Sequence, residues 1–372
     1  MNKDKVIAVS KDTVYYLTNF FPLAFCMAVC FGLGATMGIV FACITIILAP
    51  DLKTEKIMPV YTSFIILSSV IGNSLYSFFI FFGLVNLFYF IKDNFNINLY
   101  INPDSPAVSG VMLGTALTAT VLFTTDYFGI GATGERVTDM IKSYLSLGFH
   151  PNWRGVLYGT IVMVIMITFP RKFKTFSKTV SAAFIGIVIT LALNFFLNPP
   201  YMPTAITELD RGTFSFAYSK DIIKSILIGL SLFINYLYAI SKTEQTNEQF
   251  LRNGILNAGT SGLIGLPLPY GYNRNKNSIL PRFLAAGIII LFYVLFGNYV
   301  CRIPLHSCAV VIIVGAWQNV KWGELKKAFS GVIPVIMFVI TIVSSLVFDL
   351  TIGVIISAVL SFVYHKFLKK AV

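Results

Sequence analysis

Long apolar runs alternate with short polar stretches along the whole chain. A helix that crosses a bilayer needs about 20 apolar residues, and most of these runs approach that length. The sequence therefore predicts an all-α membrane protein with about fourteen transmembrane segments. The predicted segments cover residues 15–31, 34–49, 58–71, 75–91, 107–128, 155–169, 179–196, 222–240, 250–266, 265–278, 283–300, 305–320, 332–348 and 350–367.

The connections between the segments are polar, and several carry charge. Residues 131–154 and 198–211 are predicted to form polar loops. Asp349 stands between the last two segments, so we expect a tight turn there. Inside the fifth segment, Gly110 and Gly114 have a spacing that permits close packing against another helix.

Two short segments, the third and the tenth, begin at prolines. Pro59 opens the third, while Pro267 and Pro269 open the tenth, where Gly271 also relaxes the backbone. Proline cannot donate a backbone hydrogen bond, so no continuous helix should run through these positions. Such breaks are typical of discontinuous membrane helices, whose free N–H groups and positive dipole ends can hold an anion.

The two broken segments hold the same position in two halves of the chain, residues 1–205 and 206–372. Each half contains about seven segments, and because seven is odd the second half enters the membrane from the opposite side. This arrangement predicts an inverted repeat. Paired interrupted segments in such a repeat indicate a binding site near the membrane midplane.

Arg274 follows the break in the tenth segment and would add a full positive charge to the helix end. Asn273 and Asn275 flank it. The alternative is that residues 265–278 form a surface loop between two spans. In that case Arg274 simply extends to the cytoplasmic face of the membrane.

Composition supports the membrane location. Apolar residues make up 56% of the chain and charged residues 12%, whereas soluble domains carry about a quarter charged residues. The formal charge is +12, and basic residues concentrate at the termini and in the connections after even-numbered segments. By the positive-inside rule, this predicts a multi-pass protein of the cell's inner (plasma) membrane with both termini cytoplasmic and no cleaved signal peptide. The same rule explains the positive charge without nucleic-acid binding.

Enzyme chemistry has little support in the sequence. The cysteines lie in or beside apolar runs without metal-ligand spacing, which predicts small buried hydrophobic residues. They are Cys26, Cys30, Cys43, Cys301 and Cys308. The histidines are scattered, and the motifs of serine hydrolases, phosphate-binding loops and zinc proteases do not occur. We therefore expect neither catalytic activity nor a metal nor a cofactor.

Short motifs in a fixed order are similar to those of one transporter family. The densest run is Asn247-Glu248-Gln249-Phe250, Gly254, Asn257, Gly265, Pro267 and Arg274. A C-terminal series contains Ile303-Pro304-Leu305, Ala309, Ala316-Trp317, Trp322, Phe348-Asp349-Leu350 and Gly353. The first half holds Phe21-Pro22-Leu23-Ala24, Ser109-Gly110 and Gly114-Thr115-Ala116. Together these resemble the membrane domain of the sulfate permease (SulP) anion transporter family.

The resemblance implies a fold of fourteen helices in a seven-plus-seven inverted repeat, shared with uracil and xanthine permeases. It implies a core domain at residues 12–92 and 219–303 and a gate domain at residues 103–198 and 304–368. The substrate would bind between the N-termini of half-helices 3 and 10, and the core would move against the gate like an elevator. The candidate substrate-binding residues that it implies are Arg274, Asn273, Asn275, Val60, Tyr61, Phe25, Met27 and Asn235.

Two of these residues have structural alternatives. Tyr61 is an equally good core aromatic, because Phe and Tyr are abundant throughout the chain. Asn235 has the alternative of a hydrogen bond to a neighbouring helix.

The chain departs from the family pattern in three places. No acidic residue lies between Lys224 and Glu244. Many family members carry a carboxylate in this region, which can bind a proton or a sodium ion. Its absence favours exchange or facilitated movement over symport. Asn275 and Lys276 stand where a small hydroxyl residue is expected. The chain ends at Val372 without the family's STAS domain, so a separate STAS-type regulatory protein is one expected partner and a second copy of the chain is another.

These observations predict a secondary transporter of small anions, such as sulfate, bicarbonate, chloride or a small carboxylate. A nucleobase permease of the same fold is the first alternative, although the acidic residues that such permeases usually carry on the eighth and tenth helices do not occur here. A non-transporting membrane scaffold, or a subunit of a larger assembly, is the second alternative.

Overall fold

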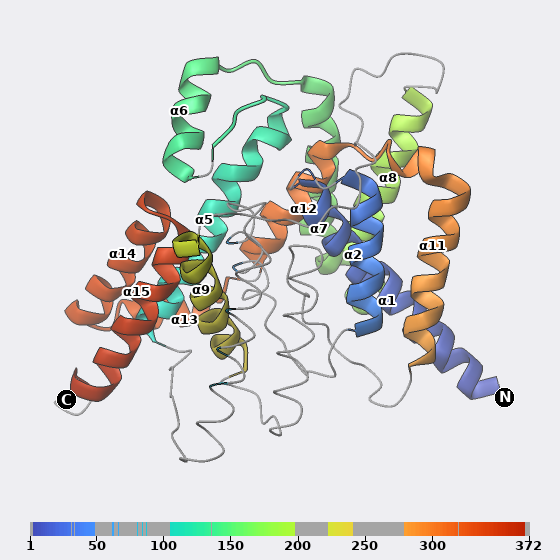
Figure 1. Cartoon of the computed structure of the whole chain (residues 1–372). Helices are drawn as coiled ribbons and strands as arrows, with labels where there is room; N and C mark the ends of the chain where they lie inside the picture. Colours follow the sequence, from blue (N-terminus) through green and yellow to red (C-terminus); the bar gives the residue numbers. More distant parts are fainter. Residues whose placement is uncertain are drawn as a thin grey trace.

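The computed structural model describes residues 3–30, 32, 34–48, 105–134, 136–197, 222–240, 279–318 and 320–368, together with Thr62, Ile66, Ile80, Leu84 and Leu87. Every regular element in this part of the chain is helical. The first helix begins and the last helix ends on the same side of the molecule, and α6 (Val137–Leu147) lies at the opposite end (Figure 1).

Among the described residues, four helices are long and apolar enough to cross a membrane by themselves. They are α1 (Lys3–Cys30), α5 (Pro106–Phe128), α7 (Trp153–Lys172) and α11 (Leu280–Val300). The shorter apolar helices are α2 (Gly34–Leu48), α8 (Ala182–Leu197), α9 (Ile222–Ile240), α12 (Leu305–Gln318), α14 (Val332–Val347) and α15 (Leu350–Val363). Each of these helices coincides with a predicted apolar segment, so helical structure is confirmed for those segments.

Two connections differ from the prediction. The expected polar loop at 131–154 contains α6, an amphipathic helix that buries only Val137 and Met140. A polar composition favours a loop, whereas Met140 packs with Ile130 and Ala132 and holds this helix against the end of α5. The charged connection after α12 likewise contains the short helix α13 (Trp322–Ala328).

The third, fourth, ninth and tenth predicted segments lie largely outside the described residues. Thr62 and Ile66 of the third segment and Ile80, Leu84 and Leu87 of the fourth are helical. The proline-bearing entries at residues 59 and 267–271 are not among the described residues. The inverted repeat therefore stays a prediction.

Helix α5 is the centre of one packed group, in which it contacts α7, α12, α14 and α15. A Cβ atom added at Gly110 would lie 2.8 Å from the carbonyl oxygen of Phe338, and one at Gly114 would lie 2.9 Å from the Cβ of Ser345. Both partners belong to α14. The predicted close packing at Gly110 and Gly114 is therefore confirmed.

Helix α1 joins a second packed group, formed with α2 and α11, to the first group. It contacts α2 and α11 on one side and α8 and α12 on the other. Figure 1 shows α1, α2 and α11 together at one side of the molecule and α14 and α15 at the other. The guanidinium of Arg282 in α11 lies 5.5 Å from the ring centre of Tyr16, which adds a cation–π contact to the α1–α11 interface.

Local sequence explains where several helices begin and end. Ser105 accepts a hydrogen bond from the N–H of Val108 and precedes Pro106, a combination that starts α5. Gly129 ends α5 in the left-handed conformation, with φ at 67°. Asp349 accepts from the N–H of Thr351 at 3.4 Å and starts α15 directly after α14, which confirms the predicted tight turn.

Candidate functional site

The described residues contain one part of the predicted anion site. Phe25 and Met27 lie on α1, Asn235 lies on α9, and all three are at most 2% exposed. The remaining predicted site residues fall outside the described ranges. They are Arg274, Asn273, Asn275, Val60 and Tyr61.

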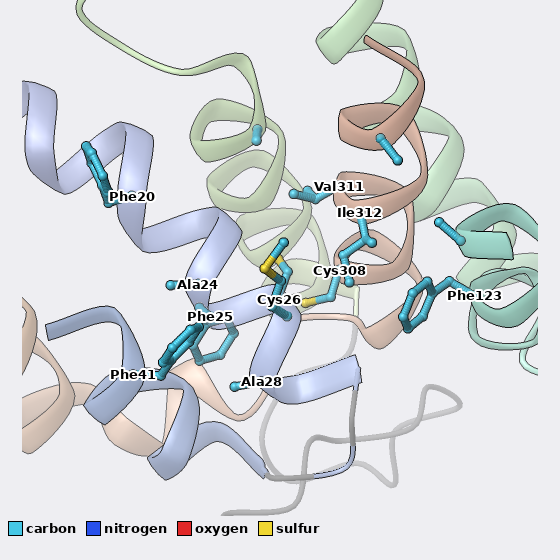
Figure 2. Close-up of a cluster of buried hydrophobic side chains, with 14 of the residues drawn as sticks. Phe20, Ala24, Phe25, Cys26, Ala28, Phe41, Phe123, Cys308, Val311 and Ile312 are labelled. Carbon is cyan, nitrogen blue, oxygen red and sulfur yellow. The ribbon is translucent and has the colours of Figure 1, made fainter. Parts of the chain in front are cut away.

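Phe25 packs into the interface between α1 and α2. Its ring stacks on Phe21, with centres 5.3 Å apart, and a Cβ added at Gly38 of α2 would lie 2.8 Å from its Cδ2 atom. Figure 2 shows the ring beside Phe41, a second α2 residue. In this structure Phe25 therefore holds two helices together, and its contact with a substrate stays a prediction.

Asn235 belongs to a polar stripe on α9. Ser231 and Tyr238 lie one turn away on the same face of the helix, and all three residues are buried. The Tyr238 hydroxyl forms a hydrogen bond of 2.7 Å with Oγ of Ser357, which joins α9 to α15. A buried amide needs hydrogen-bond partners, so Asn235 lies in a setting that suits either of its two predicted roles.

Thr62 marks the start of the third segment and sits deep in the protein. Its hydroxyl lies 2.8 Å from the hydroxyl of Thr115 on α5. The Thr115 hydroxyl also donates to the Val111 carbonyl one turn earlier on α5. Because Thr115 lies near the middle of the 23-residue helix α5, Thr62 lies at the mid-height of that helix.

This contact was missed by sequence reasoning, although a sign of it was present. Thr62 comes directly after the predicted site residues Val60 and Tyr61. A hydroxyl beside a proline break in an apolar segment needs a partner, because the membrane interior offers no water to it.

Two thiols meet where α1 touches α12. Cys26 and Cys308 are fully buried, and Figure 2 shows both side chains between the two helices. Cys43 and Cys301 are also buried, and Cys30 is half-buried, so the cysteines are the small core residues that the sequence predicts. Within the described residues, no three His, Cys, Asp or Glu side chains form a metal-binding group.

His306 at the start of α12 lies against glycines at the end of α5 and the start of α7. It is 1% exposed. A Cβ added at Gly155 of α7 would lie 1.9 Å from its Nε2 atom, and one at Gly129 would lie 2.9 Å from the same atom. The scattered histidines of the sequence gave no sign of this packing, because its partners are distant along the chain.

No protein-family profile matches the sequence, and no curated protein is similar to it. Solved structures do match. The transmembrane domain of a cyanobacterium bicarbonate transporter, BicA, superposes with a TM-score of 0.68 at 16% identity, covering 97% of this chain and 98% of that domain. A structure of SLC26A9 superposes with a TM-score of 0.71 at 12% identity, covering 98% of this chain and 66% of that one. The murine solute carrier 26 family member A9 anion transporter, in its inward-facing state, superposes with a TM-score of 0.67 at 12% identity. This match covers 99% of this chain and 69% of that one.

The superpositions extend over nearly the whole chain, whereas the identities are low. They therefore establish the fold, and with it a multi-pass membrane protein. The resemblance found in the sequence motifs is confirmed at this level. The chain has the fold of the transmembrane domain of the SulP and solute carrier 26 anion transporters.

Proposed function

We propose that this protein is a secondary transporter of small anions. The fold carries the proposal, because the chain superposes over nearly its whole length on the membrane domain of a bicarbonate transporter and on an anion transporter. Bicarbonate is the first substrate to test, followed by sulfate, chloride and small carboxylates.

The anion would bind between the N-termini of half-helices 3 and 10. Each helix N-terminus carries about half a positive charge, so two of them with Arg274 offer about +2 to a small anion. The contact of Thr62 with Thr115, at the mid-height of the membrane-length helix α5, supports this depth for the start of the third segment. In an apolar surrounding such charges act strongly on an anion, because little water screens them.

Transport would follow from a sliding movement between two bodies. We infer a core at residues 12–92 and 219–303 and a gate at residues 103–198 and 304–368. The packing of α5 with α7, α12, α14 and α15 supports the gate, and the packing of α1 with α2 and α11 supports the core. The contact between α1 and α12 would then be part of the sliding surface.

A binding measurement on the purified protein tests the site. Melting temperatures are recorded with bicarbonate, sulfate, chloride, oxalate and uracil, for the wild type, Arg274→Ala and the exposed control Arg136→Ala. An anion at 100 times its Kd stabilises the folded state by about 2.7 kcal/mol. We expect one or more anions to raise the melting temperature of the wild type and of Arg136→Ala, and Arg274→Ala to lose the shift.

Uptake of the stabilising anion into liposomes completes the test. Binding without uptake would indicate a scaffold or subunit, and a shift with uracil alone would indicate a nucleobase permease. If an anion shift persists unchanged in Arg274→Ala, Arg274 lies at the membrane surface, as in the loop alternative.

A further inference from the structure

The last turn of α7 and the connection from α7 to α8 are strongly basic and exposed. Arg171, Lys172, Lys174 and Lys178 are all exposed. No acidic residue occurs between Phe169 and Ser181 to neutralise them. We call residues 171–178 the basic turn. Its four positive charges would attract an anionic partner.

Aromatic side chains alternate with these cations. Phe173 is 48% exposed and Phe176 is 54% exposed. Both rings contact the ring of Phe169, with centres 5.1 and 6.0 Å apart, and the Lys172 amino group lies 5.7 Å from the centre of the Phe173 ring. The basic turn therefore presents a mixed surface of apolar rings and positive charges.

The backbone of the basic turn is ordered by its own hydrogen bonds. Ser177 donates its N–H to the Phe173 carbonyl at 2.9 Å, and Val180 donates to the Phe176 carbonyl at 3.0 Å. The Thr179 carbonyl accepts from the Thr18 hydroxyl at 3.0 Å and from the Asn19 amide at 3.2 Å, both on α1. The turn is thus a preformed platform fixed to α1, and its four basic side chains are exposed.

Its place in the fold puts this platform at the membrane surface. It follows the apolar helix α7 and precedes the apolar helix α8, so it stands where two membrane-crossing helices end. Phe rings at that level reach the boundary between headgroups and acyl chains, and Lys and Arg extend to the phosphates.

We propose that the basic turn binds the headgroups of anionic phospholipids. The four cations pair with lipid phosphates, while Phe173 and Phe176 enter the adjoining apolar layer. A soluble phosphate would use the cations but would leave both rings exposed to water, so the lipid is the favoured occupant. Because Thr179 is bonded to α1, bound lipid also stabilises the junction of α7, α8 and α1.

The test uses the full chain in uncharged detergent. Dioleoyl phosphatidylglycerol is titrated in, with dioleoyl phosphatidylcholine and glycerol 3-phosphate as reference ligands, and the melting temperature and lipid-bound masses are recorded. We expect phosphatidylglycerol to raise the melting temperature, and the two reference ligands to leave it unchanged. High salt should reduce the effect, because at 1 M the screening length falls to about 3 Å.

Two double variants carry the same loss of charge. A lysine near an anionic surface strengthens binding about fivefold, so Lys172→Gln with Lys174→Gln should weaken phosphatidylglycerol binding about 30-fold. Lys326→Gln with Lys366→Gln, on α13 and after α15, should leave it within about twofold of the wild type. Phe173→Ser with Phe176→Ser should also weaken it.

The outcomes separate the proposal from its rivals. The four substituted lysines are exposed in this structure, so both lysine variants should melt like the wild type without lipid. The phenylalanine variant also loses the ring contacts with Phe169, so its lipid binding is compared with its own melting temperature without lipid. Equal weakening in both lysine variants would show that overall charge alone attracts the lipid. A shift with glycerol 3-phosphate equal to that with phosphatidylglycerol would indicate a soluble-anion site. Either result overturns the lipid proposal.

Discussion

At the scale of single residues, the contact between Gly155 and His306 makes a sharp prediction. Gly155→Ala would place a methyl group 1.9 Å from Nε2 and 2.1 Å from Cδ2 of the buried imidazole, so the ring must move. Overpacking of this kind costs about 1–3 kcal/mol. We expect a lower melting temperature of the purified protein in detergent. Gly131→Ala, whose added Cβ has no atom within 4 Å, should melt like the wild type.

A double variant shows whether the ring is the cause. In Gly155→Ala with His306→Ala the clash is gone, so the loss of stability should be smaller than the sum of the two single losses. Additive losses would mean that Gly155 matters for another reason. Sequence reasoning could not find this pair, because a glycine in an apolar helix gives no hint of which distant side chain lies over it.

At the scale of helices, the interface of α5 and α14 depends on small residues. A methyl group at Gly110 would meet the backbone oxygen of Phe338 at 2.8 Å, and one at Gly114 would meet Ser345 at 2.9 Å. Since backbone cannot rotate away like a side chain, Gly110→Ala should separate the helices and destabilise the protein by about 1–3 kcal/mol.

The control for this prediction lies on α11. A Cβ at Gly287 would have no atom within 4 Å, so Gly287→Ala should be neutral or should stabilise by up to about 1 kcal/mol through better helix propensity. Melting temperatures of Gly110→Ala, Gly287→Ala and the wild type in one detergent make the comparison. If Gly110→Ala melts no lower than Gly287→Ala, the close approach of α5 and α14 is wrong.

Helices were predictable where hydrophobicity decides the structure. The run at 222–240 has the bounds of α9, and the runs at 34–49 and 107–128 agree with α2 and α5 within a residue. Membrane helices follow from apolar length, because every backbone group must be satisfied within the span. α6 was missed because its stability comes from two buried side chains on a polar background. Of the predicted site residues, only Phe25, Met27 and Asn235 belong to the part of the chain that the structure describes. The predicted starts of half-helices 3 and 10 lie outside that part.

At the scale of the whole molecule, the α1–α12 contact is where the proposed sliding of the core against the gate can be tested. Cys26 on α1 and Cys308 on α12 are both fully buried at this contact (Figure 2). If the core carries α1 past α12 in each cycle, this contact must break and reform. A covalent bridge across it would stop transport while leaving the anion site intact.

Mercuric chloride offers such a bridge, because Hg²⁺ replaces two thiol protons and joins the two soft sulfur ligands. We expect it to lower anion uptake by wild-type liposomes at least tenfold, with recovery after dithiothreitol. Cys308→Ser, which removes the α12 partner, should transport and resist mercury, whereas Cys43→Ser should stay sensitive. The anion-induced thermal shift should survive in the bridged wild type, because bridging blocks movement and not binding. Full transport by protein with a bridge confirmed by mass would show that α1 and α12 do not slide, and the core would then have to move as a body that includes α12.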